Sequence, residues 1–182
     1  MTAPLWPDLS PIPPIPPIPP LTQSSAAPPT DRSRQPPLRL AELTDADRSV
    51  WEPLARGYKA FYNTEVDAAG YDAAWRRLRA GPPLLALGAW RQDRLLGIAH
   101  GVFHASPWAD EVCYLQDLFT SPDARGLGVA AALIKELARH ARRRGCARLY
   151  WLTHESNARA RALYDRVAQH HGFIRYDLAT PL

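Results

Sequence analysis

Residues 121–130 read Ser-Pro-Asp-Ala-Arg-Gly-Leu-Gly-Val-Ala and stand between an apolar segment and the longest helical pattern of the chain. Two glycines without Cβ atoms let an anion approach the backbone, and a helix start offers unpaired N–H groups and a positive dipole end. Arg125 adds a fixed charge with two-pronged geometry. The stretch therefore predicts a cradle for a pyrophosphate, although the glycines could equally ease packing at the helix start.

Two common phosphate motifs are excluded at this position. No Gly-Lys-Ser/Thr follows, so the stretch is not a Walker A loop. The second glycine is followed by Val129, Ala130 and Ala131, so it is not a dinucleotide-binding Gly-x-Gly-x-x-Gly either.

The segments on either side of the cradle show clear periodicity. Residues 111–120 predict a strand, and residues 126–144 predict a helix that Gly145 ends. Residues 148–153 then predict a strand that leads into a helix over 157–169, with Asn157 at its entry as N-cap or ligand contact. A last strand is expected near residues 173–178.

The segments before the cradle complete the pattern. Strands are expected over residues 38–42, 84–90 and 95–104, and helices over 44–62 and 67–79, with a kink or restart at Pro53. The order β-α-α-β-β-β-α-β-α-β predicts an α+β fold. Its sheet is mixed but mostly antiparallel, flanked by helices, with one β-α-β crossover at the cradle.

Composition divides the chain in two. Residues 1–37 hold 13 of the 19 prolines, and residues 11–20 repeat Ile-Pro-Pro, so we expect a disordered tail, either a spacer or a ligand for a proline-binding module. Residues 38–182 form the expected domain. The formal charge of +4 permits an anionic ligand, and the sequence lacks an apolar run that could span a membrane, so we expect a cytoplasmic protein.

Two motifs in the right order resemble the GNAT superfamily of acetyl-CoA-dependent N-acetyltransferases. The first is Arg125-Gly126-Leu127-Gly128-Val129-Ala130, and the second is Asn157-x-x-Ala160-x-x-Leu163-Tyr164 followed by Gly172-Phe173. Residues 114–119 and 163–167 are similar to the diamine and polyamine branch, including the histone/polyamine type. The resemblance covers residues 38–178, and because relatives often dimerise it allows a homodimer.

The resemblance implies acetyl-CoA as cosubstrate, no metal, and direct attack by a primary amine of a small molecule. Asn157 would contact the pantetheine, and Tyr164 would protonate the leaving thiolate. The pantetheine arm would pair with the backbone of Leu118, Phe119 and Thr120, and an N–H near Phe119 would hold the oxyanion. The pyrophosphate would lie on Arg125, Gly126, Leu127, Gly128, Val129, Ala130 and Ala131.

The group that takes the proton of the amine stays open. The polyamine branch has Glu-Asp where this chain has Gln116-Asp117, and an amide cannot accept a proton at neutral pH. Strand alternation would place Asp117 on the face opposite Gln116. Asp117, Glu155 and water or substrate assistance are therefore the three alternatives.

The acceptor side has its own candidates. Gln116 and Asp117 would contact the substrate together with Tyr58 and Tyr62, and Phe61 and Glu65 could line the same pocket. For the aromatic side chains, packing of a helix on the sheet is an equally good interpretation.

Three functions are alternatives to the acetylation of a small amine. The acceptor could be a protein lysine, or the domain could be an inactive acetyl-CoA sensor, as Gln116 allows. A nucleic-acid module built on the arginines of residues 139–144 is not expected, because no aromatic residue lies between 127 and 144. His100 and His104 lack a third ligand, so no metal site is expected.

Overall fold

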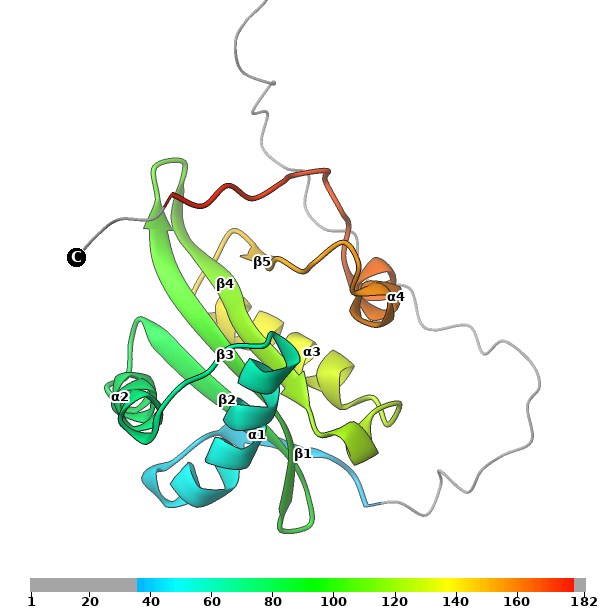
Figure 1. Ribbon diagram of the computed structural model, residues 1–182. Coiled ribbons are helices and arrows are strands. Elements are labelled where there is room, and N and C mark those ends of the chain that lie inside the picture. Colours follow the sequence, from blue (N-terminus) through cyan, green and yellow to red (C-terminus); the bar gives the residue numbers. More distant parts are fainter. Residues whose placement is uncertain (1–35, 179–182) are drawn as a thin grey trace, which may run out of the picture. The chain divides into compact units, whose positions relative to one another are not determined.

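Residues 36–178, which the computed structural model describes, contain a five-stranded sheet in the spatial order β1-β2-β3-β4-β5 (Figure 1). The first four strands are antiparallel neighbours, and β5 pairs with β4 in parallel. The strands are β1 (Arg39–Glu42), β2 (Leu84–Arg91), β3 (Arg94–Ser106), β4 (Ala109–Thr120) and β5 (Leu149–Tyr150). This arrangement confirms the α+β fold with a mixed, mostly antiparallel sheet.

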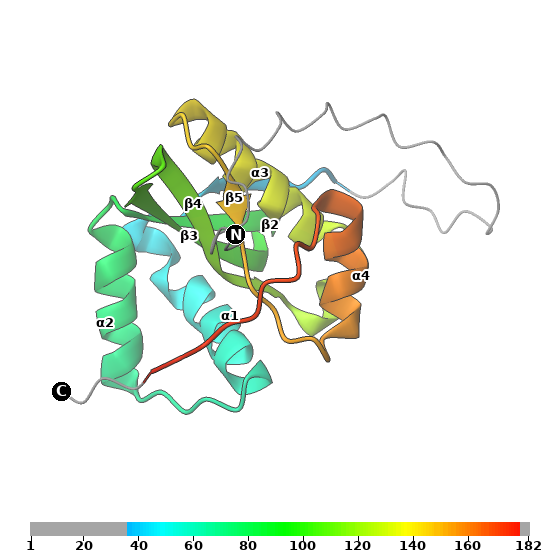
Figure 2. The same ribbon diagram turned by 90° about the horizontal axis from the view of Figure 1, so that it is seen from above.

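Helices cover both faces of the sheet (Figure 2). Helices α1 (Arg48–Phe61) and α2 (Ala68–Arg79) lie on one face, and α3 (Val129–Arg143) lies on the other. Helix α3 connects β4 to the parallel strand β5, which is the expected β-α-β crossover. Helix α4 (Ala158–Val167) packs beside α3 through Leu163 and Val167.

Each face has its own apolar core. Leu87, Leu133 and Leu137 are fully buried between the sheet and α3. Trp51 and Ile98 are buried to the same extent between the sheet and helices α1 and α2. Burial of side chains of this size stabilises the fold by about 1.5–3 kcal/mol each.

The helix boundaries follow the local sequence. Thr44 and Asp47 form the expected helix start, with the Thr44 N–H donating to Asp47 Oδ2 at 2.7 Å in a short 3-10 turn before α1. Helix α1 then runs through Pro53 without the restart that the proline predicted. The ring removes only one intrahelical hydrogen bond, and the buried Trp51 and Leu54 hold the helix against the sheet on both sides of it.

Two expected strands differ from the structure. Strand β5 has two residues instead of the six expected over 148–153, and residues 173–178 are not a strand. A strand needs a neighbour for its backbone hydrogen bonds, and among the described residues none pairs with residues 151–153 or 173–178. Phe173 and Tyr176 are consequently more than four-fifths exposed.

One expectation from the sequence concerns residues that the structure largely does not describe. The proline-rich tail, residues 1–37, falls outside the described residues except for its last two. The boundary at residue 38 therefore stays a prediction. Within residues 36–178, no helix is long and apolar enough to cross a membrane.

Replacing Leu133 with alanine tests the core beneath α3. Leu133 is fully buried, so we expect Leu133→Ala to lower the free energy of unfolding by about 2–5 kcal/mol in urea titrations followed by circular dichroism. Val50→Ala removes apolar atoms from an exposed site on α1, and should change the stability by about 0.5 kcal/mol or less. Equal losses in the two variants would contradict this assignment of the core.

Candidate functional site

One extra residue interrupts the regular pairing of β4. His100 of β3 pairs with Asp117, but the next residue, Gly101, pairs with Leu115, so Gln116 has no partner across the ladder. Leu115 and Phe119 are four residues apart, and strict alternation would place them on one face. Leu115 instead belongs to the core beneath α3, and Phe119 to the core beneath α1 and α2. A β-bulge at Gln116 thus changes the face that each later side chain occupies.

The bulge brings Asp117 to the face that α1 covers. Its Oδ2 lies 2.8 Å from Nδ1 of His100. The Tyr58 hydroxyl of α1 donates to the Gln116 carbonyl oxygen at 3.4 Å and lies close enough to the Asp117 carboxylate to lower its pKa. The expectation of strict alternation through Gln116 and Asp117 is therefore wrong. The bulge is the physical reason, and no residue type in the segment indicated it.

The bulge also reverses the direction of the backbone amides. Before it, the Cys113 N–H donates to Arg148 O, on the β5 side, at 2.9 Å. After it, the Ser121 N–H donates to Leu96 O, on the β3 side, at 2.9 Å. Successive backbone amides of a strand point alternately to its two edges. Counting back from Ser121, the Phe119 amide therefore points to β3 and the Leu118 amide to the opposite edge. The amide near Phe119 that can meet an oxyanion at this edge is therefore that of Leu118.

Strand β5 leaves this edge of β4 open. It pairs only with Cys113 and Tyr114, so within the described part of the chain no strand lies along the β5-side edge of residues 115–120, whose other edge pairs with β3. The hydroxyl of Thr120 is buried without a hydrogen-bond partner among the described residues. An extended ligand arm along this edge could use both the unpaired backbone and that hydroxyl.

The predicted cradle follows directly after β4. Gly126 and Gly128 have φ of 83° and 81°, and a Cβ added to either would meet no atom within 4 Å. The Ala132 N–H makes the first helical bond, to Gly128 O at 3.0 Å, so the amides of Val129, Ala130 and Ala131 precede it. An open, left-handed approach to unpaired helix amides fits a pyrophosphate. The side chain of Arg125 beside it is exposed.

The second motif spans the turn after β5 and helix α4. Asn157 caps α4, since its Oδ1 accepts from the Ala160 N–H at 3.3 Å and its Nδ2 donates to Thr153 Oγ1 at 3.2 Å. Tyr164 packs edge-on against Trp151, with ring centroids 5.3 Å apart. Burial, with a smaller effect of Tyr62, raises the pKa of Tyr164 to about 12. Its phenol is thus a proton donor at neutral pH.

Aromatic side chains of α1 face Asp117. Tyr58 and Tyr62 pack edge-on at 5.1 Å, and Phe61 meets Tyr62 at 5.0 Å. Phe61 is 54% exposed, so it is not a core residue as one interpretation had it, whereas Tyr58 packs against the core. Burial raises the pKa of Tyr58 and of Tyr62, and the nearby Asp117 anion raises both further.

The candidate bases occupy different surroundings. Burial by itself raises the pKa of the Asp117 carboxyl, but the interactions with His100 and, more weakly, with Tyr58 and Lys59 outweigh it and hold that pKa below its ordinary value. Asp117 is thus an anion at neutral pH. Glu155 is exposed in the turn before α4, where its backbone oxygen accepts from Arg161 at 3.0 Å. The side chain of Glu65 is exposed as well, after the end of α1.

The sequence did not predict the roles of two residues, His100, which contacts Asp117, and Trp51, which contacts His100. Trp51 Nε1 donates to Nε2 of His100 at 3.0 Å, and both side chains are buried. The available signal was a histidine inside an otherwise apolar strand. His104, which was paired with it as a metal candidate, instead lies with its Nε2 3.0 Å from the Tyr150 hydroxyl. Among residues 36–178, no group of three or more potential ligands could hold a metal ion.

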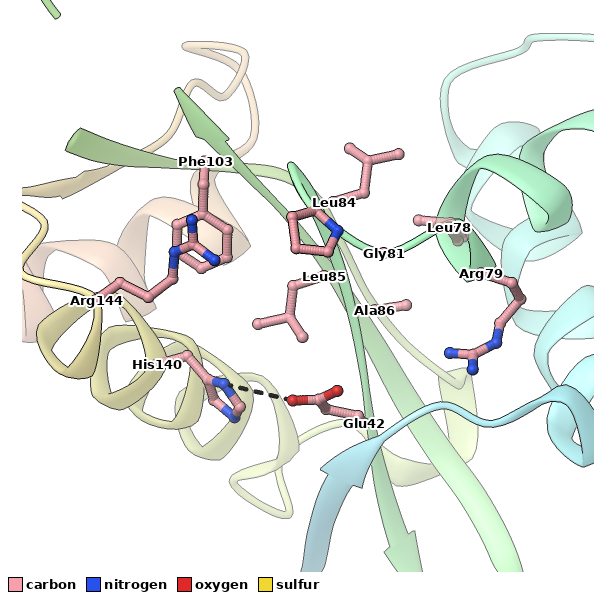
Figure 3. Close-up of a pocket in the computed structure, with 11 residues that line it drawn as sticks. Glu42, Leu78, Arg79, Gly81, Leu84, Leu85, Ala86, Phe103, His140 and Arg144 are labelled. Atoms are coloured by element: carbon pink, nitrogen blue, oxygen red, sulfur yellow. Dashed lines mark ion pairs between the residues drawn. The ribbon is translucent and has the colours of Figure 1, made fainter. Parts of the chain in front are cut away.

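A separate pocket lies at the other end of the sheet (Figure 3). Its charged side chains already have partners within the protein. Nδ1 of His140 lies 3.7 Å from Oε1 of Glu42, and Arg79 pairs with Asp45 at 2.9 Å. Arg144 pairs with Glu111 at 2.6 Å. We therefore assign no ligand to this pocket.

The arginines near the end of α3 are partly neutralised in the same way. Besides the Arg144 pair, Arg139 forms an ion pair with the buried Glu136. These contacts fit a helix end stabilised by its own ion pairs, and they do not favour a nucleic-acid surface.

Comparison with known proteins gives a consistent picture. Residues 47–168 match the acetyltransferase (GNAT) family. A D-amino-acid N-acetyltransferase of Saccharomyces cerevisiae is 31% identical over 67% of this chain and 78% of its own length. A thialysine N-epsilon-acetyltransferase of Caenorhabditis elegans is 40% identical over 34% of this chain and 39% of its own length.

Solved structures agree on the fold. AAC(6')-Iy, determined in complex with the bisubstrate analogue CoA-S-monomethyl-acetylneamine, superposes with a TM-score of 0.71 at 15% identity. The match covers 79% of this chain and 99% of that one.

Proposed function

Since the chain belongs to the acetyltransferase (GNAT) family and is an acetyl-CoA-dependent acetyltransferase, we propose that it acetylates a primary amine of a small molecule by direct attack. The acceptor classes that we propose are polyamines, diamines and amino-acid-like amines. The relatives named for D-amino acids and for thialysine support an acceptor of this size.

The observation that carries the proposal is the anionic Asp117 at the open edge of β4. Its hydrogen-bond partner is His100, the neutral Tyr58 hydroxyl lies close to it, and Lys59 acts on it from further away. The Trp51 N–H donates to Nε2 of His100, so that ring is neutral and this largely buried carboxylate has no close counter-ion, which favours the approach of a cation. The faces of Tyr58 and Tyr62 add a surface that suits an ammonium group.

The residues that hold the cosubstrate follow from the same geometry. When bound, acetyl-CoA supplies the acetyl thioester whose carbonyl carbon the amine attacks and whose thiolate leaves. The amides of Leu127–Ala131, beside Arg125, would hold its pyrophosphate, and the free edge at Leu118–Thr120 its pantetheine arm. Asn157 is engaged as a cap, so its contact with the pantetheine would use the remaining capacity of its amide.

Two groups of the chain would stabilise the charges that develop. The Leu118 amide, directed away from β3, would donate to the oxygen that becomes negative. Tyr164, whose raised pKa keeps it protonated, would give its proton to the leaving sulfur.

Proton loss from the amine is the remaining step. Asp117 would bind the ammonium, but its lowered pKa makes it a better counter-ion than base. We therefore propose that Asp117 positions the amine and that its proton leaves to water at the open edge. Glu155 is the weaker alternative because its side chain is exposed in the turn before α4. Gln116, exposed beside Asp117, would contact the substrate by hydrogen bonds only.

The other expectations stay predictions with clear discriminating results. A protein lysine is the alternative acceptor, and lysine peptides would then outperform small amines. A sensor would bind acetyl-CoA without turnover. A cytoplasmic location and a homodimer both stay predictions.

Turnover with a small amine is the primary test of the proposed function. Thiol release from acetyl-CoA should be faster with at least one member of a panel of polyamines, diamines and amino acids than with lysine peptides. Turnover restricted to lysine peptides would overturn the acceptor class. Binding without any turnover would favour the sensor.

Replacing Tyr164 with phenylalanine tests the proton donor. Loss of the hydroxyl should lower kcat for thiol release by about a hundredfold or more, with little change in acetyl-CoA binding by calorimetry. Tyr176→Phe removes a hydroxyl from an exposed residue and should leave kcat unchanged. An unchanged kcat in Tyr164→Phe would remove this residue from the mechanism.

A matched pair of glycines tests the pyrophosphate cradle. Gly128 and Gly145 flank α3, have φ of 81° and 77°, and both face open space. Asparagine tolerates this conformation, so both substitutions should preserve the fold. We expect Gly128→Asn to weaken acetyl-CoA binding about tenfold or more, because its side chain projects beside the amides. Gly145→Asn should bind normally, and equal effects would show that the cradle is misplaced.

A further inference from the structure

We propose that His100 is a positioning residue for the reaction: its Nδ1–H, directed by Trp51, orients the Asp117 carboxylate toward the acceptor amine. The proposal rests on the proposed function, in which Asp117 meets that amine. Neither His100 nor Trp51 is expected to touch the substrate, because both side chains are buried between α1, which carries Trp51, and β3, which carries His100.

The hydrogen bonds assign the histidine tautomer. The indole nitrogen of Trp51 can only donate, and it lies 3.0 Å from Nε2 of His100. Nε2 must therefore be the acceptor and carry no proton. The single ring proton is then on Nδ1, which lies 2.8 Å from Asp117 Oδ2 and donates to it. A second ring proton would have to be on Nε2, where it would face the Trp51 N–H and repel it.

The core holds this series of three residues in place. Trp51 is 1% exposed and packs against Trp75, with ring centroids 4.9 Å apart, and against Tyr71. His100 is directly opposite Asp117 in the β3–β4 register because of the bulge. His100, which the core holds in place, thus fixes Oδ2 of Asp117, and Oδ1 has no part in that contact.

The charges around Asp117 determine the sign of the expected effect. Tyr58, Lys59 and Tyr62 face it from α1, His100 from β3, and Tyr114 lies near it on β4 itself. Burial raises the pKa of the Asp117 carboxyl, and the His100 hydrogen bond is the largest influence that lowers it. Without that bond the pKa of the Asp117 carboxyl is higher. The carboxylate is then protonated at a higher pH than in the wild type.

A merely structural histidine would behave differently. If His100 only satisfied buried polar groups, its replacement would reduce the amount of folded protein. The acid side of the pH–rate profile would then stay where it is. The profile of correctly folded protein therefore separates the two roles.

The experiment compares His100→Leu with His100→Asn in the full chain. Leucine removes the donor, and the asparagine side-chain amide can place an N–H near the position of Nδ1. We expect His100→Leu to lower kcat/KM for the best amine about ten- to a hundredfold, and to move the acid limb of kcat/KM to higher pH. His100→Asn should recover most of the rate and of the limb position. Equal losses in both variants with an unmoved limb would overturn the proposal.

A readout without turnover separates this proposal from the proposed function. The carboxyl carbon of Asp117, followed by NMR with ¹³C-labelled aspartate, should titrate at a higher pH in His100→Leu than in the wild type. This holds even if no amine on the panel is acetylated. An unchanged titration would overturn the positioning role, whereas failure of every amine would overturn only the proposed acceptor class.

The tautomer itself provides a test that needs no substitution of His100. In ¹⁵N spectra of the imidazole rings, the wild type should show His100 with a protonated Nδ1 and a bare Nε2. A wild-type ring protonated on Nε2 would contradict the proposal, including in the case that His100→Leu fails to fold.

Discussion

The β-bulge at Gln116 is the constraint on which the site depends. One residue without a partner across the β3–β4 ladder changes the face of every later side chain in β4, and it reverses the direction of every later amide. The first effect places Asp117 opposite His100, beneath α1. The second directs the Leu118 amide to the edge that β5 leaves open. A regular strand would place the carboxylate against α3 and direct that amide into the sheet.

The two cores make this irregular strand rigid. The core beneath α3 holds Leu115, on one side of the bulge, and the core beneath α1 and α2 holds Phe119, on the other. Because tightly packed interiors resist small displacements, the strand cannot slide by one residue without exposing both side chains. The open edge, the cradle and Asp117 are thus held by packing that lies outside the site.

The electrostatics of the site follow from that placement. Asp117 is ionised in a largely buried position because His100 donates to it and Tyr58 lies close to it, and its charge in turn raises the pKa of Tyr58 and Tyr62. Burial beside Trp151 raises the pKa of Tyr164, so its phenol stays protonated at neutral pH. The anionic Asp117 and the protonated phenol of Tyr164 thus both lie within electrostatic reach of Tyr62.

The sequence alone determined most of the elements and the family, and it predicted the cradle at residues 121–130, because periodicity, glycines and helix starts are local properties. It did not predict the length of β5 or the unpaired residues 173–178, since a strand exists only where a neighbour satisfies its backbone. The face of Asp117, its contact with His100, the bond from Trp51 to His100 and the approach of Tyr58 were also decided only by the tertiary structure. His100, Tyr58 and Trp51 precede Asp117 by 17, 59 and 66 positions in the chain, and only the register of two strands and the packing of α1 bring them together.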